Sequence, residues 1–344
     1  MKMNKKFLII DSRPYGLFSI FLHTIDNIKW AEDNNYIPVV RWGAGRRDVN
    51  LHRPGAAKAS EFADPAHVGT EPNFSTNATK AELDKCLYSD SDQSEDEGYS
   101  CWEHFFEPVT NHTIKEALGS EHEISDIFQV GFHDLDLASL SDKFLIYNLH
   151  SYTPLNLWVH CYNNSPSLQE HREKVGLYIK KFVKVKEEIA KKVDTFTKER
   201  FSENTIGVHI RGTDKSSESY IGQRPHITVD DYITGTERAL KESPDATLFV
   251  ASDNNEAIAK MFKSFPKNKI VVYNCTRMSS YSSYLPVHLS SAVSPLLGEE
   301  ALIDCLLLSK CKHIVCTDSN LAATALYFNP EAEMTFININ LKRT

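Results

Sequence analysis

The second half of the chain alternates between short apolar runs and segments in which apolar residues have helical spacing. Apolar runs predict strands at 206–210, 247–251, 270–273, 313–316 and 334–339. Apolar residues that recur every three to four positions predict helices at 229–241, 255–264, 299–308 and 321–328. This alternation is typical of a doubly wound α/β domain, which binds its ligands at the carboxyl ends of its strands.

The beginning of the chain has a related pattern. Residues 7–10 predict a buried strand, 17–34 a helix and 37–40 a second strand, and the three together indicate a parallel βαβ unit. Residues 43–130 are irregular. They contain an acidic run at 89–98, which we interpret as a solvated loop.

The middle of the chain predicts a connection between two domains. A further buried strand is predicted at 144–149, and a long amphipathic helix follows at about 168–199. We therefore predict three parts, which are an α/β domain with the irregular insertion, a linking helix and a Rossmann-like domain. Their predicted bounds are 1–165, 166–195 and 196–344.

Composition and charge agree with a two-domain globular protein. The chain has 344 residues, a net charge of −8, 41% hydrophobic and 24% charged residues. These values exclude disordered and collagen-like chains, and the length suits two domains. The acidic balance argues against nucleic acid as a partner.

We expect a cytoplasmic protein without a membrane-spanning segment. The apolar run at 7–10 is shorter than a secretory signal requires, and no stretch approaches the roughly 20 apolar residues of a membrane helix. The seven cysteines include no Cys-x-x-Cys pair, which excludes the usual zinc and thioredoxin motifs. Reduced thiols are therefore expected.

The first candidate for chemistry is the end of the strand at 206–210. The sequence there runs through His209, Arg211, Thr213, Asp214 and Lys215. Arginine offers a planar fork of donors that suits a phosphate group. The alternative is an ion pair between Arg211 and Asp214.

Two further segments follow strands of the same predicted sheet. Ser252 and Asp253 end one strand, although such residues also commonly cap the next helix. Asp304 lies in an otherwise apolar helix and needs a partner. Residues 317–320 (Thr-Asp-Ser-Asn) open another helix, whose backbone N–H groups could bind phosphate or simply be capped.

These three segments, in this order and spacing, resemble those of the GDP-fucose-dependent fucosyltransferases. The core α1,6-fucosyltransferases and the rhizobial nodulation fucosyltransferases are most similar, and the α1,2- and protein O-fucosyltransferases more distantly so. The resemblance covers about 170–330. It implies a GT-B-type α/β fold, with two Rossmann-like domains facing each other across a cleft, in which the N-terminal domain binds the acceptor.

The resemblance also implies roles for individual residues. His209 and Asp304 match positions that recognise guanine, and Arg211 matches the arginine that contacts the β-phosphate. The remaining matches to nucleotide-sugar-binding positions are Lys215, Tyr232, Asp253, Thr317, Ser319 and Asn320. The implied reaction is an inverting, metal-independent transfer of L-fucose from GDP-fucose to a hydroxyl of a glycan or another acceptor, without a cofactor. Glu218 or Asp214 would be the base.

The sequence departs from the family at several positions. Gly212 stands where the core enzymes have a second arginine, Asn254 replaces a second acid, and Glu218 lies one position away from the family glutamate. These departures leave two other functions open. The first is a related GT-B glycosyltransferase that uses a UDP-sugar or another GDP-sugar. The second is a non-catalytic protein that binds a nucleotide sugar or a glycan.

A metal-dependent transferase is a further alternative. It would need an Asp-x-Asp motif, which residues 90–92 and 134–136 both fit. The sequence lacks a Gly-x-Ser-x-Gly elbow and a P-loop, which argues against a hydrolase of that type and a P-loop NTPase. Acceptor identity, linkage and oligomeric state are not predicted.

Overall fold

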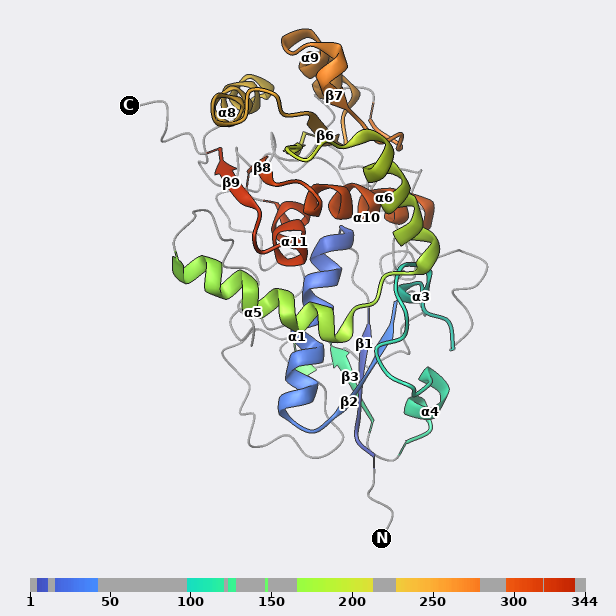
Figure 1. The fold of residues 1–344 in the computed structure, drawn as a ribbon. Coiled ribbons are helices and arrows are strands. Elements are labelled where there is room, and N and C mark those ends of the chain that lie inside the picture. Colours follow the sequence, from blue (N-terminus) through green and yellow to red (C-terminus); the bar gives the residue numbers. More distant parts are fainter. Residues whose placement is uncertain are drawn as a thin grey trace, which may run out of the picture.

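The computed structural model contains two parallel α/β sheets (Figure 1). The residues that it describes are 5–11, 16–42, 98–120, 123–127, 146–147, 166–212, 227–278, 295–317 and 319–337. Both sheets confirm the α/β fold class that the alternating pattern predicts. Among the described helices, none combines the length and the apolar character needed to cross a membrane.

The N-terminal sheet has the strand order β2-β1-β3-β4, and all its pairs are parallel. Its strands are β1 (Phe7–Asp11), β2 (Ile37–Arg41), β3 (Glu123–Ile127) and β4 (Ile146–Tyr147). The predicted βαβ unit is present, with α1 (Leu17–Asp33) between β1 and β2. Pro38 lies in β2, an edge strand, where the missing backbone N–H of proline is tolerated.

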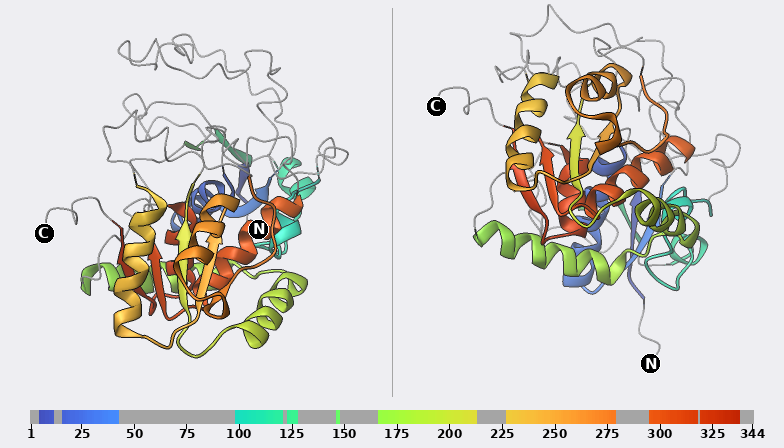
Figure 2. Two further views of the ribbon diagram at one scale, coloured as in Figure 1. Left: turned by 90° about the horizontal axis from the view of Figure 1, so that it is seen from above. Right: turned by 45° about the horizontal axis from the view of Figure 1, so that its top comes forward.

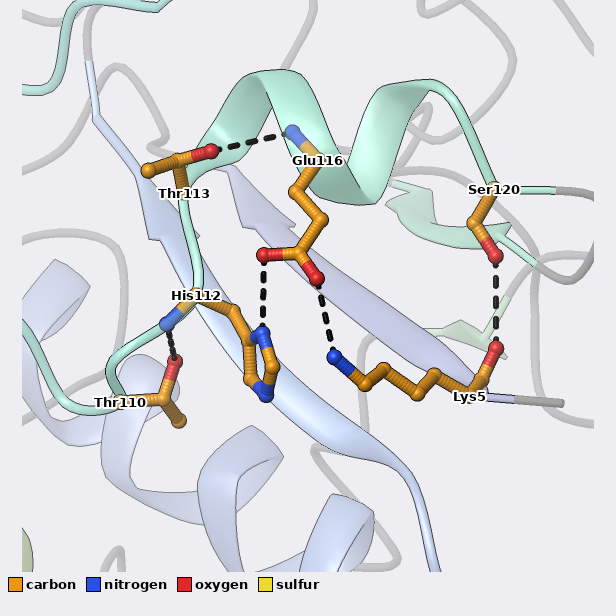
Figure 3. A network of polar contacts seen from close by, with 6 residues as sticks. All are labelled: Lys5, Thr110, His112, Thr113, Glu116 and Ser120. Carbon is orange, nitrogen blue, oxygen red and sulfur yellow. Dashed lines mark hydrogen bonds and ion pairs between the residues drawn. The ribbon is translucent and has the colours of Figure 1, made fainter. Parts of the chain in front are cut away.

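Two short helices belong to this half of the molecule. They are α3 (Trp102–Phe105) and α4 (Ile114–Leu118). A polar network anchors α4 beside β1, as Figure 3 shows. Thr113 caps the helix by accepting a hydrogen bond from the Glu116 N–H, and the Glu116 carboxylate contacts His112 at 2.9 Å and Lys5 at 3.1 Å. These two contacts hold the pKa of Glu116 below its usual value.

The C-terminal sheet has the strand order β7-β6-β5-β8-β9 and is also parallel. Its strands are β5 (Ile206–Ile210), β6 (Leu248–Ser252), β7 (Ile270–Val271), β8 (His313–Cys316) and β9 (Glu333–Phe336). Its helices are α8 (Val229–Glu242), α9 (Asn255–Ser264), α10 (Pro295–Ser309) and α11 (Asn320–Phe328).

Alternate side chains of these strands enter two different cores. On one face, Val208 and Val250 pack with α8 and α9. On the other face, Phe249 and Ala251 pack with α10 and α11. The core on the α10 and α11 face continues into the N-terminal half. The ring centroids of Phe21 in α1 and Phe328 in α11 are 6.1 Å apart, and Phe21 belongs to the same hydrophobic cluster. One hydrophobic core therefore serves both sheets, and Figure 1 shows α10 and α11 lying between them.

The connecting segment forms two helices, α5 (Pro166–Phe182) and α6 (Glu187–Arg200), where the sequence predicts one. The break lies at 183–186, which is extended and pairs with the chain after α3. Glu107 N donates to Lys184 O at 2.7 Å, and Lys186 N donates to Phe105 O at 2.9 Å. Figure 2 shows α5 and α6 as separate, differently oriented helices.

The segment predicted to be irregular, 43–130, contains more order than its composition indicates. Two helices, α3 and α4, and the strand β3 fall within it, and β3 adds to the N-terminal sheet beside β1. The short lengths of these elements explain why they give little periodic signal. The acidic run at 89–98 and both Asp-x-Asp sequences lie outside the described residues, apart from Gly98.

Candidate functional site

Three of the predicted site residues follow three neighbouring strands. Arg211 comes directly after β5, Asp253 after β6 and Thr317 after β8. Because these strands are parallel, their carboxyl ends meet at one edge of the sheet, and the register places Ile210 opposite Ser252. The sheet therefore brings the three segments together, as a ligand site at this edge requires.

The end of β6 is tied to the end of β5. Gly212 N donates to the Asp253 carboxylate at 3.1 Å. The helix-capping role that was equally plausible for Ser252 and Asp253 belongs to Asn254, whose side chain accepts from Ala257 N at 3.0 Å. Asp253 is thus directed at the strand edge rather than at the helix that follows.

Tyr232 is fully buried in α8. Its hydroxyl lies 3.0 Å from the hydroxyl of Thr317, and both residues are buried. The contact holds the Thr317 hydroxyl at the carboxyl end of β8. A role of Tyr232 in binding a nucleotide sugar stays a prediction.

The amino terminus of α11 lies at the same edge. Ser319 is the N-cap residue, and its side chain makes no capping hydrogen bond. The first backbone N–H groups of a helix have no partner within the helix, and the helix dipole adds positive potential there. Asn320 opens the helix. This terminus therefore has the properties that phosphate binding requires.

A close approach between β5 and α10 brings His209 and Asp304 to the same layer. A Cβ atom on Gly207 would lie 2.8 Å from Leu308 and 3.0 Å from Cys311, so glycine lets α10 pack directly on the strand. Asp304 lies one helical turn before Leu308, and His209 lies two residues after Gly207, on the same face of the strand. One turn back along α10 and two residues forward along β5 both lead toward the carboxyl edge of the C-terminal sheet.

Two polar atoms in this layer are buried without a hydrogen-bond partner among the described residues. They are His209 Nδ1 and Asp304 Oδ1. Burial lowers the pKa of His209 to about 3, with a smaller effect from the Arg211 charge, so the imidazole is neutral. Burial raises the pKa of Asp304 to about 7. Buried polar atoms normally have partners, so this pair indicates a place that a polar ligand would complete.

Two residues near Asp304 were missed by the sequence analysis. The Cys275 thiol donates to Asp304 Oδ2 at 3.6 Å, and Arg277 lies close enough to lower the pKa of Asp304 against the effect of burial. Both belong to the polar segment after β7. The rule applied to the other strands, that ligands bind beyond carboxyl ends, also points to this segment.

The described residues contain one group that could hold a metal ion, and it lies at the other edge of the sheet. Glu242, His313 and Glu333 place ligand atoms within 4.8 Å of one another. His313 Nδ1 is 3.3 Å from Glu333, and its Nε2 is 2.8 Å from the Thr335 hydroxyl. These contacts satisfy both ring nitrogens without a metal.

Three of the predicted site residues lie outside the described residues. They are Asp214, Lys215 and Glu218. The candidate base and one cation are therefore known from sequence alone. The five described cysteines, at 101, 275, 305, 311 and 316, are free thiols.

Comparison with known proteins gives one family. The family model of alpha-(1,6)-fucosyltransferase N- and catalytic domains matches residues 91–323. Among solved structures, fucosyltransferase NodZ from Bradyrhizobium is 13% identical, with 94% of this chain and 93% of that chain covered and a TM-score of 0.45. POFUT1 in complex with GDP-fucose is 9% identical, with 97% and 98% covered and a TM-score of 0.47. A search of the curated proteins finds no match.

Proposed function

Because the chain belongs to the alpha-(1,6)-fucosyltransferase family, we propose that it transfers L-fucose from GDP-fucose to a hydroxyl of a glycan or another acceptor. The transfer is inverting and independent of metal ions. The enzyme is a glycosyltransferase by family, and the donor, the stereochemistry and the metal independence are the proposed parts.

The observation that carries the proposal is the pair of unpartnered atoms between β5 and α10. An ionised Asp304 can accept hydrogen bonds from the N1–H and N2–H groups of guanine, and the neutral His209 can bond to a second edge of the base or to the ribose. Guanine has two adjacent hydrogen-bond donors, and binding them would explain why Asp304 stands in the otherwise apolar helix α10.

The diphosphate would lie along the same edge. We expect Arg211, which follows β5, and the backbone N–H groups at the start of α11 to bind its oxygens, together with Thr317 and Asn320. The acceptor oxygen attacks the anomeric carbon while the bond to the β-phosphate oxygen breaks. The acceptor proton passes to a carboxylate, Glu218 or Asp214, and GDP leaves. Arg211 stabilises the negative charge that grows on the β-phosphate.

A nucleotide titration tests the donor and the metal requirement together. We expect GDP to raise the melting temperature, whereas UDP, ADP and CMP do not, and we expect the same shift with EDTA and with magnesium. A ligand that binds only the folded protein adds about 2.7 kcal/mol of stability at 100 times its dissociation constant, which thermal unfolding detects easily.

Other outcomes of this titration contradict specific parts of the proposal. Stabilisation by UDP instead of GDP would favour the alternative donor that Gly212 leaves open. Stabilisation only with magnesium would contradict metal independence. GDP binding without sugar transfer to any acceptor would favour a non-catalytic nucleotide-sugar-binding protein.

Asp304→Asn is expected to weaken GDP binding by tenfold or more, because a hydrogen bond to a charged group contributes about 1.5–3 kcal/mol. The unaltered protein should bind GDP more tightly as the pH rises through about 7, where Asp304 ionises. His209 stays neutral in that range, since its pKa is about 3. Calorimetric titration from pH 5.5 to 8.5 should therefore show a rise of affinity with pH that is smaller in Asp304→Asn, where only the GDP phosphate still titrates.

Protein stability provides the control for this variant. The folded protein raises the pKa of Asp304 above its ordinary value, so the folded state is favoured by protonation, and this contribution is lost as the pH rises through about 7. The amide that Asp304→Asn introduces cannot ionise. The variant should therefore unfold at an equal or higher temperature than the unaltered protein at pH 8. Unchanged GDP affinity would contradict the guanine contact.

A further inference from the structure

Arg277 ties the segment after β7 to the end of β6. Its guanidinium donates to three backbone carbonyl oxygens, from Nε to Ser252 O at 3.0 Å, from Nη1 to Cys275 O at 3.0 Å and from Nη2 to Tyr273 O at 2.5 Å. Two of these oxygens belong to residues 272–278, which we call the Arg277 segment, and the third belongs to the last residue of β6. One side chain thus fixes both the shape and the position of this segment.

Backbone contacts continue the attachment on the β6 side. Met278 N donates to Asp253 O at 2.8 Å, and Asn255 N donates to Met278 O at 3.0 Å. These bonds join the end of the Arg277 segment to the residues between β6 and α9. Asp253 is the residue whose carboxylate holds the end of β5.

The other side of the segment contacts α10. Thr276 N donates to the Glu300 carboxylate at 2.8 Å, and the Cys275 thiol donates to Asp304 Oδ2 at 3.6 Å. The thiol occupies one oxygen of Asp304, while Oδ1 has no partner among the described residues. The segment therefore spans from the edge of the sheet to the acid in α10.

We infer that Arg277 is a positioning residue for the base-binding end of the nucleotide site, because it holds the segment that places Cys275 against Asp304. The inference deepens the proposed function and depends on it for the identity of the base. Arg277 itself acts on the nucleotide through this segment and through Asp304.

The charge of Arg277 has a second effect on the same acid. The titratable and charged groups that interact with Asp304 are Arg277, Cys275 and Tyr273 from the segment and Glu300 and Cys305 from α10. Burial raises the pKa of Asp304 most, while Arg277 is the largest influence that lowers it. Arg277 therefore keeps a larger fraction of Asp304 ionised, and only the ionised acid accepts two hydrogen bonds from the base.

Two substitutions separate position from charge. Lysine keeps the positive charge but has a single ammonium group, which cannot direct donors at three carbonyl oxygens in one plane. Methionine removes both the charge and the donors. Arg238→Lys, at an exposed position on α8, is the matched control.

The first readouts need no nucleotide. In Arg277→Lys, the backbone amides of 272–278 should exchange with deuterium at least tenfold faster than in the unaltered protein. In Arg277→Met, the ¹³C NMR signal of the Asp304 carboxyl, assigned with Asp304→Asn, should titrate at a higher pH than about 7. Arg238→Lys should change neither.

The nucleotide readout follows by calorimetry. Both Arg277 variants should bind GDP at least tenfold more weakly at pH 7, and in Arg277→Met the rise of affinity with pH should move upward with the Asp304 titration. Unchanged exchange together with an unchanged Asp304 titration would overturn the inference, whatever GDP does. Failure of the unaltered protein to bind GDP would instead contradict the proposed function, while exchange and NMR still decide the role of Arg277.

Discussion

Arg211→Ala is expected to lower the rate of fucosyl transfer by about 10²- to 10³-fold, because removing a donor to charge that develops in a transition state has effects of this size. The charge on the β-phosphate grows as GDP leaves, so GDP-fucose binding should weaken less than kcat falls. Arg211 follows β5 at a partly exposed position. Released GDP and transferred sugar, measured with a series of acceptors, check the result.

Two variants control for other causes. Arg211→Lys should recover part of the rate, because the charge remains while the planar fork is lost. Arg238→Ala, on the exposed face of α8, should leave the rate unchanged. Transfer by Arg211→Ala at more than a tenth of the normal rate would contradict the phosphate role.

Trp102→Ala is expected to give the largest loss of stability, about 3–5 kcal/mol, which is typical when a buried Trp is truncated. The Trp102 ring lies 4.4 Å from the Phe106 ring and 4.9 Å from the Trp42 ring, and its Nε1 donates to Glu107 O at 3.0 Å. The truncation leaves both a cavity and an unpaired carbonyl oxygen. Urea unfolding followed by circular dichroism and by fluorescence measures the loss.

Trp30→Ala is the matched control, because Trp30 is only partly buried and packs at the edge of the same cluster. It should cost clearly less than Trp102→Ala. Since Trp102 belongs to the core that serves both sheets, the two halves should unfold in one transition in the unaltered protein. Two separate transitions, with Trp102→Ala moving only one, would contradict a shared core.

The C-terminal sheet could be predicted closely from the sequence. Its strands β5 and β8 and its helix α9 occupy the predicted residues, because buried parallel strands are continuous apolar runs and their covering helices are amphipathic. Helix α10 begins four residues earlier than predicted, at Pro295. Its start carries no periodic signal, since the helix is apolar on nearly all sides.

The elements that could not be predicted depend on partners far away in the sequence. The break between α5 and α6 exists because 183–186 pairs with the chain after α3, a contact that local spacing does not encode. Likewise, β3 is a strand because β1 accepts it as a neighbour. The predicted domain bounds at 165 and 196 stay predictions, and both sheets share one core.

The site residues also divide into those that the local sequence pattern predicts and those that depend on distant contacts. His209, Arg211 and Asp253 could be found because each follows or ends an apolar run. The geometric role of Tyr232, as the partner of Thr317, depends on the packing of α8 against β8. Arg277 could not be identified from the sequence because its three acceptors are backbone carbonyl oxygens, which residues of every type supply.

The contact between α1 and α11 bears on how the protein is made. Synthesis produces α1, residues 17–33, long before α11, residues 320–328. Until α11 emerges from the ribosome, Phe21 lacks Phe328, and part of the apolar surface of α1 stays in water. The packing of α1 in the shared core therefore cannot be complete before α11 has been synthesised. Nascent chains that stop before residue 320 should be substrates for chaperones and proteases.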